Sequence, residues 1–204
     1  MPINYTIEAD VVDITSDTPK TSDVFLVDTN VWFWMTYPNA GQSSNPYQLS
    51  NYPKYVNIAL QKGARVCRTG FSLAELSHRI EETEHEIYRN YVKPIDLKEY
   101  RHNLPVERTR IVSEVQAAWG QVKSLAEPLA LTIDEPTTDA SLARFQTEKV
   151  DGYDLFILET LAKHGLIQII TDDGDFATIP GIQVFTANRN VLKSARAQGR
   201  LMTR

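Results

Sequence analysis

The chain has 204 residues, of which 42% are hydrophobic and 23% are charged, a balance typical of one globular domain. Its net charge of −5 excludes a generic nucleic-acid coat, so RNA or DNA would have to bind through local basic patches or metal ions. The single cysteine, Cys67, excludes a disulfide framework and a cysteine-based metal site within the chain, and the four histidines have no metal-ligand spacing.

The first third of the chain predicts two strands separated by a loop and a helix. Residues 1–23 are polar with weak alternation and predict an edge strand or an arm. The apolar run 24–27 (VFLV) predicts a central strand that is buried on both faces. The segment 32–53, first aromatic and then rich in Gly, Ser, Asn and Pro, predicts a loop over the end of the sheet. A helix is expected over 54–63, ended by its glycine, and a second strand over 64–69.

The rest of the chain alternates helices and strands. The expected elements are a helix over 72–92, further helical sequence over 95–127, strands over 128–133, 166–171 and 181–186, and helices over 137–150 and 151–165. The basic segment 189–204 predicts a solvated helix and tail. This alternation predicts a single α/β domain with a parallel sheet and helices on both faces. Because no segment has the length of a membrane span and the start of the chain does not resemble a secretory signal, we expect a cytoplasmic protein.

Four acidic residues from separate parts of the chain are expected at one edge of this sheet. Asp28 and Asp173 follow strands, whereas Glu75 and Asp154 lie near the starts of helices that follow strands, and all of these positions fall on the carboxyl edge. Two charges 4 Å apart cost about 4 kcal/mol at an effective dielectric near 20, and no Lys or Arg stands beside Asp28 or within 171–176. The pattern therefore predicts a divalent cation, Mg²⁺ or Mn²⁺, whose usual chemistry is hydrolysis of a phosphodiester by an activated water.

Each acid also has a purely structural interpretation. Glu75 could form a capping box with Ser72. Asp154 could stabilise the first turn of a helix that Asp151 caps. The remaining acids could be ordinary, solvated turn residues. The expected meeting of all four at one sheet edge favours the functional interpretation.

These motifs resemble those of PIN-domain nucleases. The sequences VFLVDTN over 24–30, SLAEL over 72–76 and DLFILETLAKHGLIQIITDDGDF over 154–176 follow the family's order, and the last block matches its spacing closely. The resemblance covers 24–80 and 129–187, and it implies a three-layer α/β/α PIN-like fold with a central, mostly parallel sheet. VapC-like toxin ribonucleases, which antitoxins neutralise, are the nearest group.

The resemblance also implies a set of site residues. The implied catalytic and metal-binding residues are Asp28, Glu75, Asp154 and Asp173, with Asp175 as a frequent extra acid, Asn30 and Thr171 as supporting residues, and Asp172 at a variable position that is solvated or secondary. Together the acids would hold one or two Mg²⁺ or Mn²⁺ ions and cut RNA to leave a 5′-phosphate and a 3′-hydroxyl. The implied partners are an RNA substrate, an antitoxin and a second copy of the chain in a homodimer.

Two features depart from the usual toxin: an extra helical segment over 91–127 with the arm over 1–23, and the long aromatic segment after Asn30. Trp32 in that segment could stack on unpaired bases, or the segment could pack locally or at a dimer interface. The basic residues that could contact an RNA backbone are Arg189, Lys193, Arg196, Arg200 and Arg204.

Three other functions are open at this point. The chain could be a PIN nuclease of RNA processing or defence, or a non-catalytic module that binds RNA or protein. Aspartyl-phosphate chemistry would need a second acid beside Asp28 or a paired lysine on a later strand, and the sequence has neither.

Overall fold

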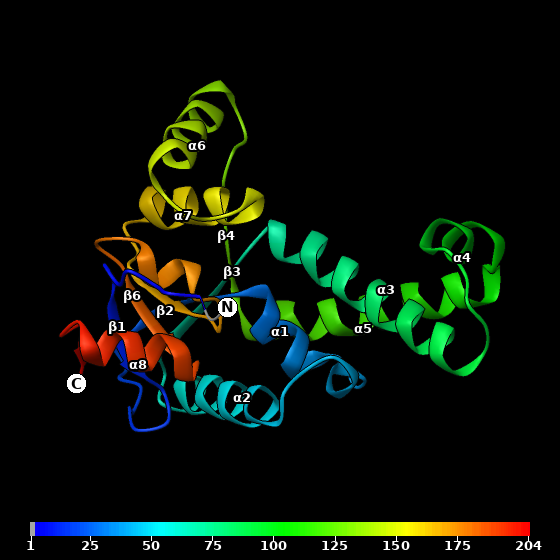
Figure 1. The fold of residues 1–204 in the computed structure, drawn as a ribbon, viewed down its shortest axis with the longest axis horizontal. Helices are drawn as coiled ribbons and strands as arrows, with labels where there is room; N and C mark the ends of the chain where they lie inside the picture. Colours follow the sequence, from blue (N-terminus) through cyan, green and yellow to red (C-terminus); the bar gives the residue numbers. More distant parts are fainter. Residues whose placement is uncertain (1–2) are drawn as a thin grey trace.

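The computed structural model describes residues 3–204, and over that range it contains one seven-stranded sheet in which all neighbouring strands are parallel (Figure 1). The strand order is β4-β3-β2-β5-β6-β1-β7. The strands are β1 (Asp10–Asp13), β2 (Val24–Val27), β3 (Arg65–Thr69), β4 (Glu127–Leu129), β5 (Gln168–Ile170), β6 (Gln183–Thr186) and β7 (Leu201–Met202).

Helices cover both faces of the sheet. They are α1 (Thr29–Thr36), α2 (Pro46–Gln61), α3 (Phe71–Tyr91), α4 (Leu97–Asn103), α5 (Pro105–Leu125), α6 (Glu135–Thr147), α7 (Gly152–His164) and α8 (Arg189–Ala197), with short 3₁₀ turns η1 (Ala40–Gln42) and η2 (Asp175–Thr178). Phe25 and Val27 of β2 pack into one core with α1, α2 and part of α5, whereas Leu26 packs into a second core with α7. The predicted three-layer α/β/α class and the burial of 24–27 on both faces are therefore confirmed.

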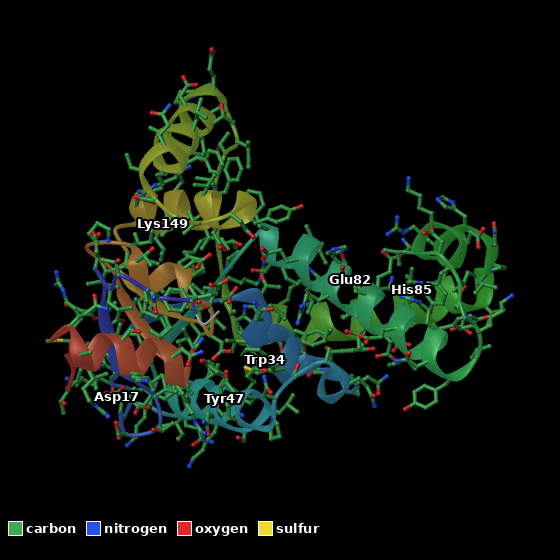
Figure 2. The ribbon with its side chains drawn as sticks, in the orientation of Figure 1. Asp17, Trp34, Tyr47, Glu82, His85 and Lys149 are labelled. Carbon is green, nitrogen blue, oxygen red and sulfur yellow. The ribbon has the colours of Figure 1, made fainter. Side chains whose placement is uncertain are left out.

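The predicted loop over 32–53 is confirmed only for residues 37–45, which connect α1 to α2 and include η1, and is wrong at both ends. The chain enters α1 directly after Asp28, and this helix buries aromatic side chains that the composition suggested were on a loop. Pro46 occupies the first turn of α2, behind an Asn45 that forms a capping box with Gln48. Proline is favoured at that position because the first helical N–H groups have no partner within the helix. Trp34 and Tyr47 accordingly lie along α1 and the start of α2 (Figure 2).

The two ends of the described chain meet in the sheet. β1 lies inside the sheet rather than at its edge, because β7 pairs with Val11 and Val12 on the outer side. The predicted solvated tail after α8 is therefore wrong. Of the predicted edge strand or arm over 1–23, residues 1 and 2 lie outside the described residues, Asp10–Asp13 form β1, and residues 14–23 connect β1 to β2.

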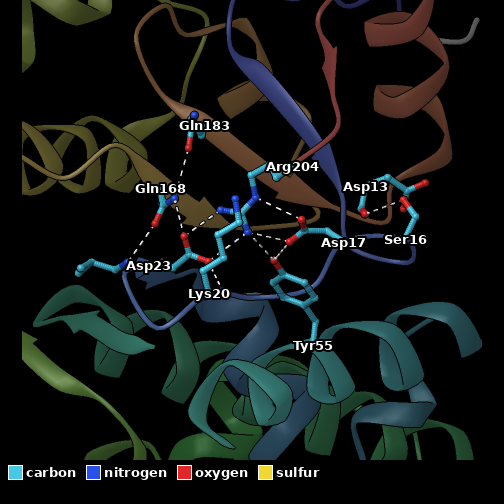
Figure 3. A network of polar contacts seen from close by, with 10 residues as sticks. Asp13, Ser16, Asp17, Lys20, Asp23, Tyr55, Gln168, Gln183 and Arg204 are labelled. Atoms are coloured by element: carbon cyan, nitrogen blue, oxygen red, sulfur yellow. Dashed lines mark hydrogen bonds and ion pairs between the residues drawn. The ribbon is translucent and has the colours of Figure 1, made fainter. Parts of the chain in front are cut away.

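The side chain of Arg204 is largely buried at this end of the fold and does not extend into solvent. Its guanidinium donates hydrogen bonds to Asp17 and Asp23 at 2.7 Å and 2.8 Å (Figure 3). It also lies over the Phe185 ring. Both aspartate side chains are 5% exposed or less. Arg204 is therefore unavailable as an RNA contact, contrary to the prediction.

The extra sequence over 91–127 is helical, as predicted, and forms α4 and α5, which with α3 make a helical arm that extends from the sheet. Figure 1 shows α3 and α5 running side by side to a tip formed by α4. Glu81 of α3 is buried and accepts hydrogen bonds from Arg101 and Arg108, which joins the three helices. Within residues 3–204, no helix has both the length and the apolar character that crossing a membrane requires.

Candidate active site

The four predicted acids line one cleft of about 280 Å³. Asp28 follows β2, and Asp173 follows β5, the neighbouring strand. Glu75 lies near the start of α3, after β3 on the other side of β2, and Asp154 lies in the first turn of α7. The sheet order thus brings together residues from four separate segments, as the strand and helix pattern predicts.

Asp28 is held by hydrogen bonds to side chains rather than used as a helix cap. It stands at the N-cap position of α1, but its carboxylate makes no capping hydrogen bond. The Thr171 hydroxyl donates to Asp28 Oδ2 at 2.8 Å, and the Asn30 amide lies 3.5 Å from the same oxygen. Thr171 is fully buried and also accepts a 2.9 Å hydrogen bond from the Asp173 N–H. The predicted support of the acids by Asn30 and Thr171 is therefore present.

Glu75 is held by α1 rather than by a capping box. The N-cap of α3 is Gly70, and the hydroxyl of Ser72 lies 3.3 Å from that of Thr69 instead of capping the helix. The Glu75 carboxylate accepts a hydrogen bond from the Thr29 hydroxyl. The capping interpretation of Glu75 is therefore wrong, and its carboxylate faces the cleft.

The cleft brings several carboxyl groups together where they are largely buried from water. Burial raises the pKa of Asp28 to about 6, with the Thr171 hydrogen bond lowering it and the charge of Asp173 raising it. Burial, opposed by the Thr29 hydrogen bond, raises the pKa of Glu75 to about 7. Burial and then the charges of neighbouring carboxylates raise the pKa of Asp154 to about 9. Burial is the largest cause of all three pKa shifts, and no basic side chain is among the leading causes that oppose them.

The donor set fits a hard divalent cation by its chemistry. All four side chains offer carboxylate oxygens, which are the ligands that Mg²⁺ and Mn²⁺ prefer. Among residues 3–204, no three His, Cys, Asp or Glu side chains already stand in the arrangement of a metal site. Since like charges repel, a cation would have to draw the carboxylates together as it binds.

The motif analysis assigned no site role to the other residues that line the cleft, which are Thr29, Ala74, His78, Arg79, Asp151 and Tyr153. Arg79 lies one helical turn after Glu75, and this i, i+4 spacing on α3 is the signal that could have identified it. Its guanidinium lies 5.2 Å from the Phe33 ring centre, and its Nε has no hydrogen-bond partner among the described residues. Asp151 occupies the predicted N-cap position of α7, but its side chain caps nothing and lines the cleft instead.

The other two aspartates of the turn have different surroundings. Asp172 accepts hydrogen bonds from Tyr47 at 2.8 Å and Gln48 at 2.6 Å, and also from Tyr52, so it anchors the turn to α2 and is not a solvated turn residue. Asp175 does not line the acidic cleft but a neighbouring hollow, and only its N–H contacts Asp173, at 2.9 Å from Oδ1. The predicted metal role of Asp175 therefore has less geometric support than that of the four acids.

The predicted RNA contacts are only partly accessible. Trp32 lies on α1 and is fully buried in the core, so it packs locally, the second of the two expected alternatives, and cannot stack on bases. Arg189, Lys193 and Arg196 are exposed along α8, whereas the Arg200 guanidinium lies 3.8 Å from Asp10.

No protein-family model matches the chain, and a comparison with curated proteins gives no match either. The likeness to PIN-domain nucleases therefore stays a resemblance carried by three motifs, and the function has to be argued from the cleft.

Proposed function

We propose that the chain is a metal-dependent endoribonuclease that hydrolyses RNA phosphodiester bonds in the acidic cleft. The observation that carries this proposal is the convergence of Asp28, Glu75, Asp154 and Asp173 in one partly buried place. Buried like charges weaken a fold, and no capping role accounts for Asp28 or Glu75. A divalent cation bound by these carboxylates would offset their charge and would also bind a phosphate group of RNA.

The four acids would hold one or two Mg²⁺ or Mn²⁺ ions. A cation held by these carboxylates would lower the pKa of a bound water molecule and would offset the negative charge that develops on the phosphate. The chain's own hydroxyl groups orient the ligands: Thr171 holds Asp28, and Thr29 holds Glu75. These two hydrogen bonds fix the orientation of two of the four carboxylates.

Arg79 would contribute the positive charge that the acids lack. It lines the cleft on the same helix as Glu75, so a phosphate bound by the acids through a cation would also lie near the guanidinium. In the proposed reaction the oxygen of water bonds to phosphorus and the bond from phosphorus to O3′ breaks. The products are a 5′-phosphate and a 3′-hydroxyl, with the proton transferred to O3′. The toxin role, the antitoxin and the homodimer stay predictions from the resemblance.

The first test is cleavage of an end-labelled RNA of mixed sequence with Mg²⁺, with Mn²⁺ and with EDTA. Asp28→Asn and Asp154→Asn should each lower the cleavage rate by more than about a hundredfold. Removing a residue that only hydrogen-bonds to a metal ligand already costs up to about a hundredfold, and loss of a ligand itself should cost more. The matched control is Asp139→Asn, the same change at an exposed acid of α6.

Two outcomes would contradict the proposal. Cleavage that continues in EDTA would show that the reaction needs no divalent cation. Full activity of Asp28→Asn would show that the acidic cleft is not the active site. A DNA oligonucleotide of the same sequence tests the substrate class. Equal cleavage of RNA and DNA would show that the enzyme is a general nuclease and not a ribonuclease.

A further inference from the structure

A second hollow of about 360 Å³, the polar hollow, lies next to the acidic cleft. Asn30, Arg79 and Asp173 line both cavities, so the two are neighbours across these side chains. The rest of the lining is rich in amide and hydroxyl groups, namely Ser43, Ser44, Asn45, Gln48 and Asn188. Groups of this kind donate to and accept from the edges of nucleobases.

Two aromatic residues line the polar hollow, Trp34, which is buried, and Tyr5, which an unusually close contact places. A Cβ atom on Gly174 would lie 2.2 Å from Tyr5 Cζ and 2.5 Å from its hydroxyl oxygen. Gly174 has a φ of −75°, which any residue adopts easily, so the backbone does not demand glycine here. The glycine is needed because the Tyr5 ring lies directly against it, in the same turn as Asp173.

The segment around Tyr5 is fastened on both sides. The Gln198 side chain donates from Nε2 to the Tyr5 carbonyl and accepts from the Ile7 N–H, each at 2.9 Å. Ile7 is buried, and the Glu8 N–H donates to the Ala177 carbonyl at 3.0 Å. Tyr5 itself is partly exposed, so the N-terminal segment holds its ring in a fixed position at the wall of the polar hollow.

Arg79 stands between the two cavities. Contact with the Phe33 ring orients its guanidinium, and its Nε has no hydrogen-bond partner in the described part of the chain. A planar cation in this position is suited to a phosphate that joins two bound nucleotides.

We propose that the polar hollow binds the nucleotide next to the scissile phosphate of single-stranded RNA, with its base against Tyr5 and a backbone phosphate at Arg79. The inference rests on the proposed function, because it takes the acidic cleft as the place of cleavage. Single-stranded RNA is the expected class because a base can reach an aromatic ring only when it is unpaired. In this arrangement Tyr5 stacks on the base, one of the two roles expected for Trp32, and holds it against the amide and hydroxyl groups that read its edge.

The first experiment measures cleavage of a randomised RNA and maps the bases beside each cut. We expect Tyr5→Ala to raise KM about tenfold, a typical effect of losing one stacked base, to leave kcat within about twofold, and to flatten the base preference beside the cut. Tyr5→Phe should keep both properties. Tyr91→Ala is the control, because Tyr91 is 77% exposed at the end of α3. An unchanged KM and base preference in Tyr5→Ala would overturn the inference and leave the nuclease intact.

The second experiment does not depend on cutting. Asp28→Asn protein is irradiated with single-stranded RNA that carries 4-thiouridine, and the crosslinked peptides are identified after trypsin. Residues 1–20 form one tryptic peptide in which Tyr5 is the only aromatic residue. We expect a crosslink on this peptide that Tyr5→Ala abolishes and that Gln198→Ala weakens by loosening the arm.

The two experiments separate the possible failures. A Tyr5-dependent crosslink without any cleavage by the wild type would support the polar hollow and contradict the nuclease. Crosslinks that all fall outside residues 1–20, or that Tyr5→Ala leaves unchanged, would overturn the polar hollow whatever the cleavage assay gives.

Discussion

The Thr171 hydroxyl donates a 2.8 Å hydrogen bond to Asp28 and so joins the end of β5 to the end of β2. The same hydroxyl accepts the Asp173 N–H, which makes one buried side chain responsible for the relative placement of two acids of the cleft.

Thr171→Val should therefore damage both stability and activity. Valine has nearly the same shape, but it leaves the Asp173 N–H and the Asp28 carboxylate without their partner. We expect a loss of about 1–3 kcal/mol in the free energy of unfolding, the usual effect of an unsatisfied buried group, measured by urea denaturation. Thr171→Ser keeps the hydroxyl and is the control. If Thr171→Val were no more destabilising than Thr171→Ser, which loses only the methyl group, the two hydrogen bonds of the hydroxyl would contribute little to stability.

The metal-free protein should become less stable as the pH rises from weakly acidic to weakly basic. The pKa values of Asp28, Glu75 and Asp154 are raised to about 6, 7 and 9, whereas in an unfolded chain such groups titrate near about 4. The folded state thus holds more protons than the unfolded state over this window, and the free energy of unfolding falls as they are released.

Thermal unfolding in EDTA between pH 5 and pH 9 measures this slope. Asp154→Asn should flatten it and should be more stable than the wild type at pH 8, because the amide cannot ionise. A wild-type Tm that rises across this range would show that the carboxyl groups are not protonated in the folded protein.

Mg²⁺ and Mn²⁺ should stabilise the wild type and should release protons when they bind. The proton release follows from the raised pKa values, because bound carboxylates must be ionised. Calorimetry in two buffers of different ionisation enthalpy counts the protons. Glu75→Gln should weaken the binding of either ion, whereas Asp139→Asn should bind as the wild type does, and equal binding by Glu75→Gln would remove Glu75 from the metal ligands.

Arg204→Met should be strongly destabilising. It leaves the buried Asp17 and Asp23 without their cation, and breaking a buried ion pair from one side costs about 3–5 kcal/mol. Burial raises the pKa of Asp23, but hydrogen bonds led by that of Arg204 outweigh it and hold the pKa below its usual value. The contribution of Asp23 to stability is therefore present at neutral pH and lost as the pH falls through the acid range.

Urea denaturation at pH 7 and in the acid range tests both parts of this prediction. Arg200→Met is the control, because Arg200 is exposed and its guanidinium lies 3.8 Å from Asp10. Equal effects of the two substitutions would show that the cluster around Arg204 adds little to stability.

The exposed cations of α8 should contribute to the salt dependence of RNA binding. Replacing Arg189, Lys193 and Arg196 together by alanine should reduce the slope of log K against log salt by about 2, since each contact to a single strand contributes about 0.7. Deleting the tail is a poorer test because it also removes β7 and Arg204. The control replaces Arg89, Lys93 and Lys98, three exposed cations near the tip of the helical arm. Equal slopes in the two variants would exclude α8 as the contact surface.

The prediction of a loop over 32–53 failed at both ends, where α1 and α2 lie, for a physical reason. Aromatic residues next to Gly, Ser, Asn and Pro are typical of loop composition, but Trp32 and Phe33 are fully buried on α1. The Asn45-Pro46 pair begins a helix instead of breaking one. β7 was missed because two residues have no recognisable period, and their strand conformation depends on pairing with β1.

The sequence by itself determined the layered α/β class and the meeting of Asp28, Glu75, Asp154 and Asp173. Both follow from rules that act along the chain, because hydrophobic period selects strand or helix and parallel strands send their ends to one edge. Only the tertiary structure decided that Arg204 lies between Asp17 and Asp23, that Tyr5 lies on Gly174 and that Arg79 lines both cavities. These contacts join segments that are distant in sequence, and they depend on side-chain shape and burial that no local pattern encodes.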